Sequence, residues 1–143
     1  MVQSKVFTNN VADYEKWYER YPDVYESELV ALREHFKQLP EDLHGIEVGL
    51  GTGRFSQPLG IKEGIEPSEE MAAVAVKRGI EIMDGVAERL PYRDLRFDFV
   101  LFVTICHLDG PLAAFKEAFR VLKHKGSVII GFLDRDREIA KSY

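Results

Sequence analysis

Hydrophobic and polar positions follow a helical period at the start of the chain. Apolar side chains in residues 22–40 recur at spacings of three and four: Tyr25, Leu29, Leu32, Phe36 and Leu39. This spacing places them on one face of a helix. A helix with one buried face is therefore predicted in this segment.

Five apolar runs further along the chain predict the strands of a sheet. They lie at residues 45–48, 64–66, 80–83, 97–105 and 127–133. The last two runs are continuously apolar, as expected for strands that are covered on both faces. A short helix is predicted at 54–59, and a longer one is predicted between Ser68, a suitable N-cap, and Gly79.

Another helix is predicted after Pro111, between the last two strands. Leu112, Phe115, Phe119 and Leu122 recur there at helical spacing, which predicts that they form the buried face. Strand and helix thus alternate along the chain. This alternation predicts an α/β fold around a mainly parallel sheet of about five strands, with helices on both faces.

Composition and charge exclude several classes of function. The 143 residues are 45% apolar, enough for one domain with its own core. A net charge of −5 disfavours general nucleic-acid binding, and a lone cysteine, Cys106, allows neither an internal disulfide nor a zinc site. No apolar stretch approaches membrane-spanning length. We therefore expect a cytoplasmic protein with no metal site and no nucleic-acid or membrane partner.

A cluster of glycines directly follows the first predicted strand. Its pattern is E-x-G-x-G-x-G, formed by Glu47, Gly49, Gly51 and Gly53. A dinucleotide fingerprint would have a third glycine where Arg54 stands, and no Gly-Lys-Ser/Thr follows as in a P-loop. The pattern indicates a turn whose backbone comes close to a ligand, preceded by a carboxylate that could accept hydrogen bonds from an ammonium group.

A second acidic residue, Glu66, stands at the carboxyl end of the next predicted strand. In nucleotide-binding sheets an acidic residue at this place binds the ribose hydroxyls. The predicted ligand therefore has a ribose but no pyrophosphate.

Five segments, taken in order, resemble one known family. They are IEVGLGTGRF, GIEPSEEM, GVAERLPY, FDFVLFVTICHL and AFRVLKHKGSVIIG, within a similarity that covers roughly residues 10–135. The family is the class I S-adenosylmethionine-dependent methyltransferases of the small-molecule type, related to the ubiquinone/menaquinone enzymes. The resemblance implies a Rossmann-like fold with a helical cap at 1–40 and a core at 41–143. It also implies that the family's last two strands are lacking.

The resemblance implies S-adenosylmethionine as cofactor, with S-adenosylhomocysteine as product. Glu47 and the turn Gly49–Gly53 would hold the methionine part, and Glu66 would bind the ribose. Pro67 and Met71 would pack on the adenine.

Further contacts to the cofactor are implied by the same resemblance. A backbone amide at Ala87 or Glu88 would reach the adenine, whereas Val86 stands in place of the family's usual Asp. Thr104 is assigned to the cofactor site as well. The aromatic residues Tyr14, Trp17 and Tyr18 are candidates to cover the cofactor.

The implied reaction is methyl transfer to a small-molecule acceptor. His107, after the fourth strand, is the catalytic candidate and would orient or deprotonate the acceptor; a structural role is the alternative. Two other functions stay open: a cofactor-binding module without catalysis, because part of the acceptor pocket is missing, and an NAD-dependent dehydrogenase, which Arg54 disfavours. An apolar strand at 127–133 without the family's last strands also predicts a homodimer through this edge.

Overall fold

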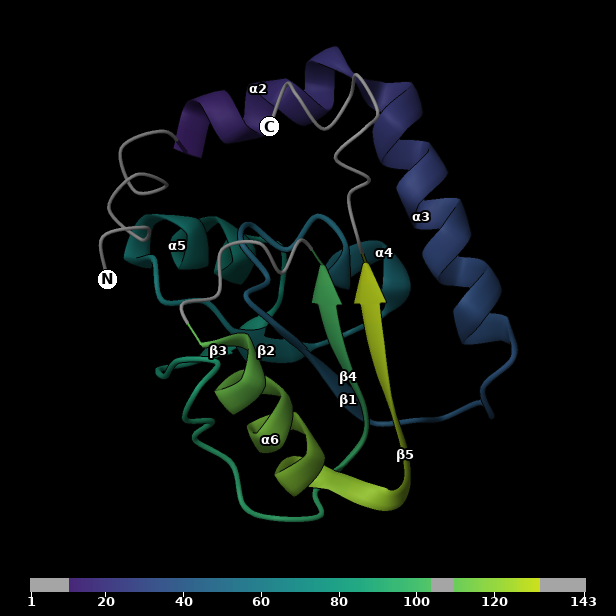
Figure 1. Cartoon of the computed structure of the whole chain (residues 1–143). Coiled ribbons are helices and arrows are strands. Elements are labelled where there is room, and N and C mark those ends of the chain that lie inside the picture. Colours follow the sequence, from purple (N-terminus) through teal and green to yellow (C-terminus); the bar gives the residue numbers. More distant parts are fainter. Residues whose placement is uncertain (1–10, 104–109, 132–143) are drawn as a thin grey trace.

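The computed structural model describes residues 11–103 and 110–131 of the chain (Figure 1). Its helices are α2 (Val11–Arg20), α3 (Pro22–Lys37), α4 (Ser56–Leu59), α5 (Glu69–Lys77) and α6 (Pro111–Val121). Its strands are β1 (Gly45–Val48), β2 (Glu63–Ile65), β3 (Glu81–Met83), β4 (Phe97–Val103) and β5 (Leu122–Gly131). The predicted alternation of strand and helix is confirmed.

The five strands form one sheet in the order β3-β2-β1-β4-β5, and every pairing is parallel. The central strand β1 places Glu47 beside Gly64 of β2 and Leu101 of β4. Since parallel strands all end at the same edge of the sheet, the turn after β1 and the residue after β2 become neighbours. The topology thus brings the glycine cluster and Glu66 together.

Helices cover both faces of the sheet, as predicted. We call α2 and α3 the cap; α2 lies across the carboxyl ends of the strands, beyond the arrowheads in Figure 1, and α3 runs beside the sheet. Phe99 and Leu101 of β4 pack with the cap, whereas Val100 and Phe102 pack with α6 on the other face. The continuous apolar pattern of β4 therefore reflects burial on both faces.

The buried face of α6 differs from the prediction. Leu112 and Phe119 are 67% and 72% exposed, whereas Ala114, Ala118 and Val121 are buried. Small side chains let the helix backbone approach the sheet closely. The larger side chains lie outside this contact, although Phe115 still packs on Phe102 with ring centroids 5.6 Å apart. The predicted stripe was wrong for this reason, and its last member, Leu122, belongs to β5.

Some boundaries also differ from the prediction. Strand β5 begins at Leu122 rather than at residue 127, because Leu122 pairs with Phe97 of β4; the register of the ladder then shifts between Phe97 and Phe99, which pairs with Ser127. The predicted strand ends at 104–105 and 132–133 lie outside the described residues. The Ser68 N-cap is confirmed: its hydroxyl accepts a hydrogen bond from the Met71 N–H at 3.4 Å.

Candidate cofactor site

The glycine cluster forms a turn in which three residues have left-handed backbone geometry. Gly49, Gly51 and Gly53 have φ values of 73°, 60° and 82°. Only glycine adopts such angles without strain. A Cβ at Gly53 would lie 2.2 Å from the Ile80 side chain, a Cβ at Gly51 would lie 3.1 Å from the Tyr14 hydroxyl, and a Cβ at Gly49 would meet open space. Gly53 therefore serves packing, whereas Gly49 borders open space.

The carboxylate of Glu66 is tied directly to this turn. One oxygen accepts a hydrogen bond from the Gly51 N–H at 2.8 Å, and the other accepts one from the Ser68 N–H at 3.0 Å. Burial raises the pKa of Glu66 despite these two hydrogen bonds. Each carboxylate oxygen has a second lone pair, so Glu66 can still accept hydrogen bonds from ligand hydroxyls.

Glu47 lies at the centre of the sheet and is only 1% exposed. It accepts a hydrogen bond from the Ser56 hydroxyl at 2.6 Å. Burial, with a smaller contribution from the nearby Glu66 charge, raises the pKa of Glu47 to about 8 against the opposing effect of the hydrogen bonds from Ser56. A ligand ammonium group would favour the ionised carboxylate. The two acids and the open turn therefore fit a ligand that carries hydroxyls and a cation.

A cavity of about 500 Å³ lies past the carboxyl ends of β2 and β3. Pro67, Asp84, Val86 and Leu90 are among its lining residues. The other predicted adenine contacts are placed differently: the Met71 side chain is buried and 2% exposed. Ala87 is also buried, and the Glu88 carboxylate accepts a hydrogen bond from the Gly110 N–H at 3.3 Å. Pro67 is therefore the predicted adenine residue that lines the cavity, and Asp84 is a polar residue there that the sequence analysis missed.

The three aromatic candidates of the cap lie in different places. Tyr14 reaches the glycine turn, as its distance from Gly51 shows. Tyr18 is 3% exposed and belongs to the core between the cap and the sheet. The Trp17 ring packs against the rings of Tyr18 and Tyr21, with centroids 5.1 and 5.0 Å away. Tyr14 is the one of these three that borders the turn.

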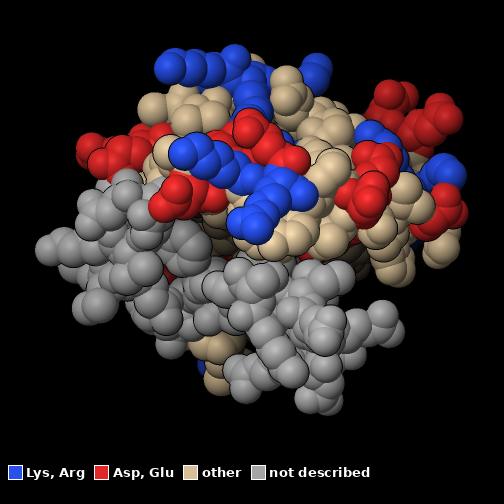
Figure 2. Space-filling view, turned by 90° about the horizontal axis from the view of Figure 1, so that it is seen from above, with Lys and Arg blue, Asp and Glu red and all other residues tan. Residues whose placement is uncertain are grey.

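Sequence analysis missed a cluster of charged side chains under the cap. Glu15 of α2 accepts hydrogen bonds from Arg54, directly after the glycine turn, and from Arg78 after α5. Arg54 was noted only because it replaces a fingerprint glycine. Figure 2, which views this end of the molecule from above, shows basic and acidic side chains interspersed over its described part.

Three residues singled out in the sequence, Thr104, Cys106 and His107, lie outside the described residues. Within residues 11–103 and 110–131, no three His, Cys, Asp or Glu side chains come together as metal ligands. In the same ranges no helix combines the length and the apolar character that crossing a membrane requires.

Comparison with known proteins identifies the family. Residues 46–130 match the family described as "Methyltransferase domain", and this match covers more than half of the chain. The chain belongs to this family. Its predicted class, a class I S-adenosylmethionine-dependent methyltransferase with a Rossmann-like fold, is thereby confirmed, and S-adenosylmethionine is the cofactor of that class.

A crystal structure from Thermotoga maritima, titled "SAM-dependent methyltransferase, possible histamine N-methyltransferase", is similar to almost the whole chain. The TM-score is 0.89 and the identity 45%, covering 99% of this chain and 67% of that one. The PH0226 protein of Pyrococcus horikoshii shares 28% identity at a TM-score of 0.69, over 89% of this chain and 65% of that one.

Curated relatives are longer than this chain. An uncharacterised protein of Methanocaldococcus jannaschii is 42% identical over 96% of this chain, which corresponds to 66% of that protein. An uncharacterised protein of Mycobacterium tuberculosis is 32% identical over the whole chain, which corresponds to 50% of its own length. The chain thus spans between half and two thirds of these relatives.

Proposed function

We propose that this chain binds S-adenosylmethionine at the carboxyl ends of β1 and β2 and transfers its methyl group to a small-molecule acceptor. One observation carries the proposal. The partly buried Glu66 carboxylate accepts a hydrogen bond from the N–H of Gly51, inside a turn of three left-handed glycines. The carboxylate that would accept hydrogen bonds from the ribose is thus held directly against the backbone that the ligand would approach.

Each part of the cofactor has a proposed partner. Glu66 would accept hydrogen bonds from the ribose hydroxyls, and Glu47 would pair with the ammonium group of the methionine part. The backbone at Gly49 and Gly51 would lie against that methionine part, with Tyr14 on its cap side. These assignments use the two carboxylates whose pKa values burial has raised.

The adenine would enter the cavity behind Pro67. Met71, Ala87 and Glu88 stay proposed contacts at its margins. Val86 has no hydrogen-bonding side chain, whereas Asp84 lines the same cavity. We therefore assign to Asp84 the acceptor for the adenine amino group.

The protein's part in the reaction is to position the acceptor and exclude water. When bound, S-adenosylmethionine supplies an activated methyl group on its sulfonium. Good alignment of two reactants supplies roughly 7 to 11 kcal/mol of the barrier. Trp17 and Thr104 remain proposed cofactor contacts. His107 remains the proposed group that orients the acceptor or takes its proton.

A small-molecule acceptor is supported by the similar Thermotoga maritima protein, which is described as a possible histamine N-methyltransferase and so as acting on a small amine. The mixed charges on the described part of the cap end also offer no extended basic face for a nucleic acid (Figure 2). We further propose that the protein acts in the cytoplasm, where a single cysteine is kept reduced.

The direct test has two steps. Calorimetry should show that the purified chain binds S-adenosylhomocysteine, and it should show no heat with NAD. Labelled methyl groups should then pass from S-adenosylmethionine to a member of a panel of small amines, alcohols and thiols. Binding without transfer to any acceptor would instead favour a cofactor-binding module.

We also propose that two copies associate through the β5 edge of the sheet. Among the described strands β5 has a partner on one side only, and α6 beside it exposes Leu112 and Phe119. Proteins usually cover such an edge. Ultracentrifugation should detect a dimer that Ile129→Lys weakens; a stable monomer at high micromolar concentration would exclude it.

A further inference from the structure

The carboxylate of Glu15 joins three segments that are far apart in the sequence. Its Oε2 accepts hydrogen bonds from Arg54 Nη2 and from Arg78 Nη2, each at 2.7 Å. Arg54 Nε adds a contact at 3.1 Å, and the Thr52 hydroxyl donates to Oε1. The cap helix α2, the glycine turn and the end of α5 thus meet at one side chain.

Both arginines are held in place by further contacts. Arg78 Nη1 donates to the Thr52 carbonyl at 2.7 Å. The Arg54 guanidinium lies over the ring of Tyr18, 5.3 Å from its centroid, and the Tyr25 hydroxyl donates to the Arg54 carbonyl. Charged groups fixed in this way bind more strongly than mobile surface charges.

This ion cluster is shielded from solvent and stays charged. The side chains of Glu15, Arg54 and Arg78 are 18%, 15% and 23% exposed. Burial alone would raise the pKa of Glu15, but the hydrogen bonds from Arg78, Arg54 and Thr52 outweigh it and lower this pKa to about 2. Glu15 is therefore ionised at every pH at which the protein would work.

The cluster borders the candidate cofactor site on two sides. Tyr14 precedes Glu15, and its hydroxyl lies 3.1 Å from the place of a Cβ on Gly51. Thr52, which donates to Glu15, follows Gly51, whose N–H donates to Glu66. A continuous set of contacts therefore runs from α2 through the turn to the proposed ribose acceptor.

We infer that Glu15 is a positioning residue for the cofactor. Its carboxylate holds α2 closed on the glycine turn, which keeps Tyr14 against Gly51 and the Gly51 N–H on Glu66. This inference rests on the proposed binding of S-adenosylmethionine at the turn. A bound cofactor would leave more easily once the cluster is broken, so Glu15 should act mainly on the dissociation rate.

The test compares Glu15→Gln with Glu19→Gln. Glu19 lies on the same helix and 3.9 Å from Arg54, but its side chain is 70% exposed. Stopped-flow displacement should show that Glu15→Gln raises the dissociation rate of S-adenosylhomocysteine about tenfold or more, since several charge-assisted hydrogen bonds are lost. Glu19→Gln should stay close to the wild-type rate.

A second readout reports the cap itself. Trp17, the chain's one tryptophan, lies in α2 two residues from Glu15. Acrylamide should quench its fluorescence more strongly in Glu15→Gln than in the wild type or in Glu19→Gln. In the double variant Glu15→Gln/Arg54→Gln, the dissociation rate should rise by less than the product of the increases seen in the two single variants. The reason is that the two side chains act as one unit.

The milder variant Thr52→Val removes one donor to Glu15 and nearly preserves shape, so it replaces Glu15→Gln if the latter does not fold. It should raise the dissociation rate by a smaller factor in the same direction. Folded variants that release S-adenosylhomocysteine at the wild-type rate would overturn the role of Glu15. Failure of the wild-type chain to bind S-adenosylhomocysteine would instead overturn the proposed function.

Discussion

The carboxylates at the two ends of the sheet have pKa values that are shifted in opposite directions. At the amino end, Asp98 of β4 accepts a hydrogen bond from the His44 N–H at 2.8 Å and pairs with Lys123 of β5 at 3.4 Å. The His44 hydrogen bond, with help from Lys123, lowers the pKa of Asp98. At the carboxyl end, burial raises the pKa values of Glu47 and Glu66.

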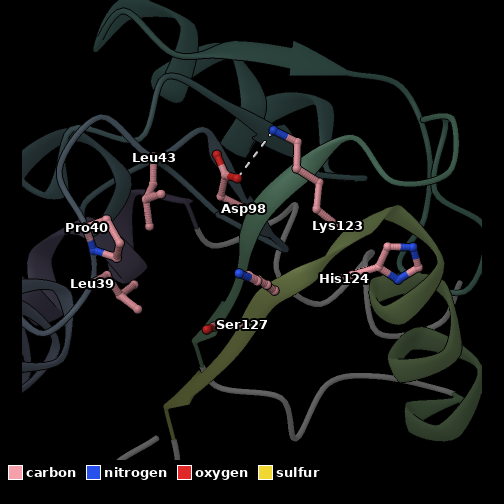
Figure 3. A pocket seen from close by; sticks show the side chains of 8 residues that line it. Leu39, Pro40, Leu43, Asp98, Lys123, His124 and Ser127 are labelled. Carbon is pink, nitrogen blue, oxygen red and sulfur yellow. Dashed lines mark ion pairs between the residues drawn. The ribbon is translucent and has the colours of Figure 1, made fainter.

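A cavity is present at each end, so volume alone does not distinguish them. The amino-end cavity is about 380 Å³ and is lined by Leu39, Leu43, Asp98 and Lys123, among others (Figure 3). Its acid already has a cationic partner. The acids at the carboxyl end would gain most from a ligand that carries donors and a positive charge. The comparison therefore supports the proposed ligand site at the carboxyl end.

The largest expected effect is that of Gly51→Val, which should abolish cofactor binding. The residue has φ 60°, and a side chain would enter the space between the turn and the Tyr14 hydroxyl. Gly79→Val is the matched control: Gly79 also has a positive φ, but it lies before β3, at the other end of the sheet. Calorimetry that finds normal binding in a folded Gly51→Val protein would place the ligand elsewhere.

Glu66→Ala should weaken S-adenosylhomocysteine binding by at least about tenfold, because hydrogen bonds to a charged group are lost. Isothermal titration measures the change. Glu69→Ala serves as control, since Glu69 is an exposed residue in the first turn of α5. Equal affinities for Glu66→Ala and the wild type would remove Glu66 from the site.

Glu47 should make the stability of the ligand-free protein depend on pH. Its pKa is about 8 in the folded protein and near 4.5 when exposed. Between these values the folded state keeps a proton that the unfolded state releases, so the free energy of unfolding falls as pH rises through this window. Glu47→Gln should lose less stability than the wild type between pH 5 and pH 8 in denaturant titrations.

The same measurements with ligand sharpen this prediction. S-adenosylhomocysteine carries an ammonium group that would favour the ionised Glu47, so saturation should reduce the wild type's loss of stability at high pH. Identical pH profiles for the wild type and Glu47→Gln would show that Glu47 is not the titrating group.

The smallest effect is expected at the amino end of the sheet. Asp98→Ala should leave cofactor affinity unchanged and should reduce the free energy of unfolding by about 1 kcal/mol or less, as is usual for a solvent-screened ion pair. Thermal unfolding and calorimetry on one preparation measure both quantities. A marked loss of cofactor affinity would contradict the contrast between the two ends.

Local patterns predicted most of the elements around the site. Short apolar runs identified β1 and β2, and Ser68 marked the start of α5 because its hydroxyl can cap only neighbouring N–H groups. The spacing of Gly49, Gly51 and Gly53 indicated a turn, and in the structure all three glycines of this turn have left-handed angles. These features depend on residues close together in the chain.

The face of α6 shows where such patterns fail. Large apolar residues at helical spacing predicted burial of Leu112 and Phe119. In the structure Ala114 and Ala118 are buried instead. Periodicity locates an apolar stripe, but the partner surface decides how close the helix approaches and which side chains fit.

The sequence by itself determined a parallel α/β sheet, a glycine turn after its first strand and an acid after its second. Only the tertiary structure brought Glu15 to Arg54 and Arg78, which lie 39 and 63 positions away in the chain. Charged residues on a helix carry no local signal of a distant partner. In the sequence alone, a charge that will be shielded in an ion pair cannot be distinguished from a charge on a solvated helix face. The packing of α2 across the carboxyl ends of the strands removes most of that solvent, and the pairing of these charges offsets part of the desolvation cost.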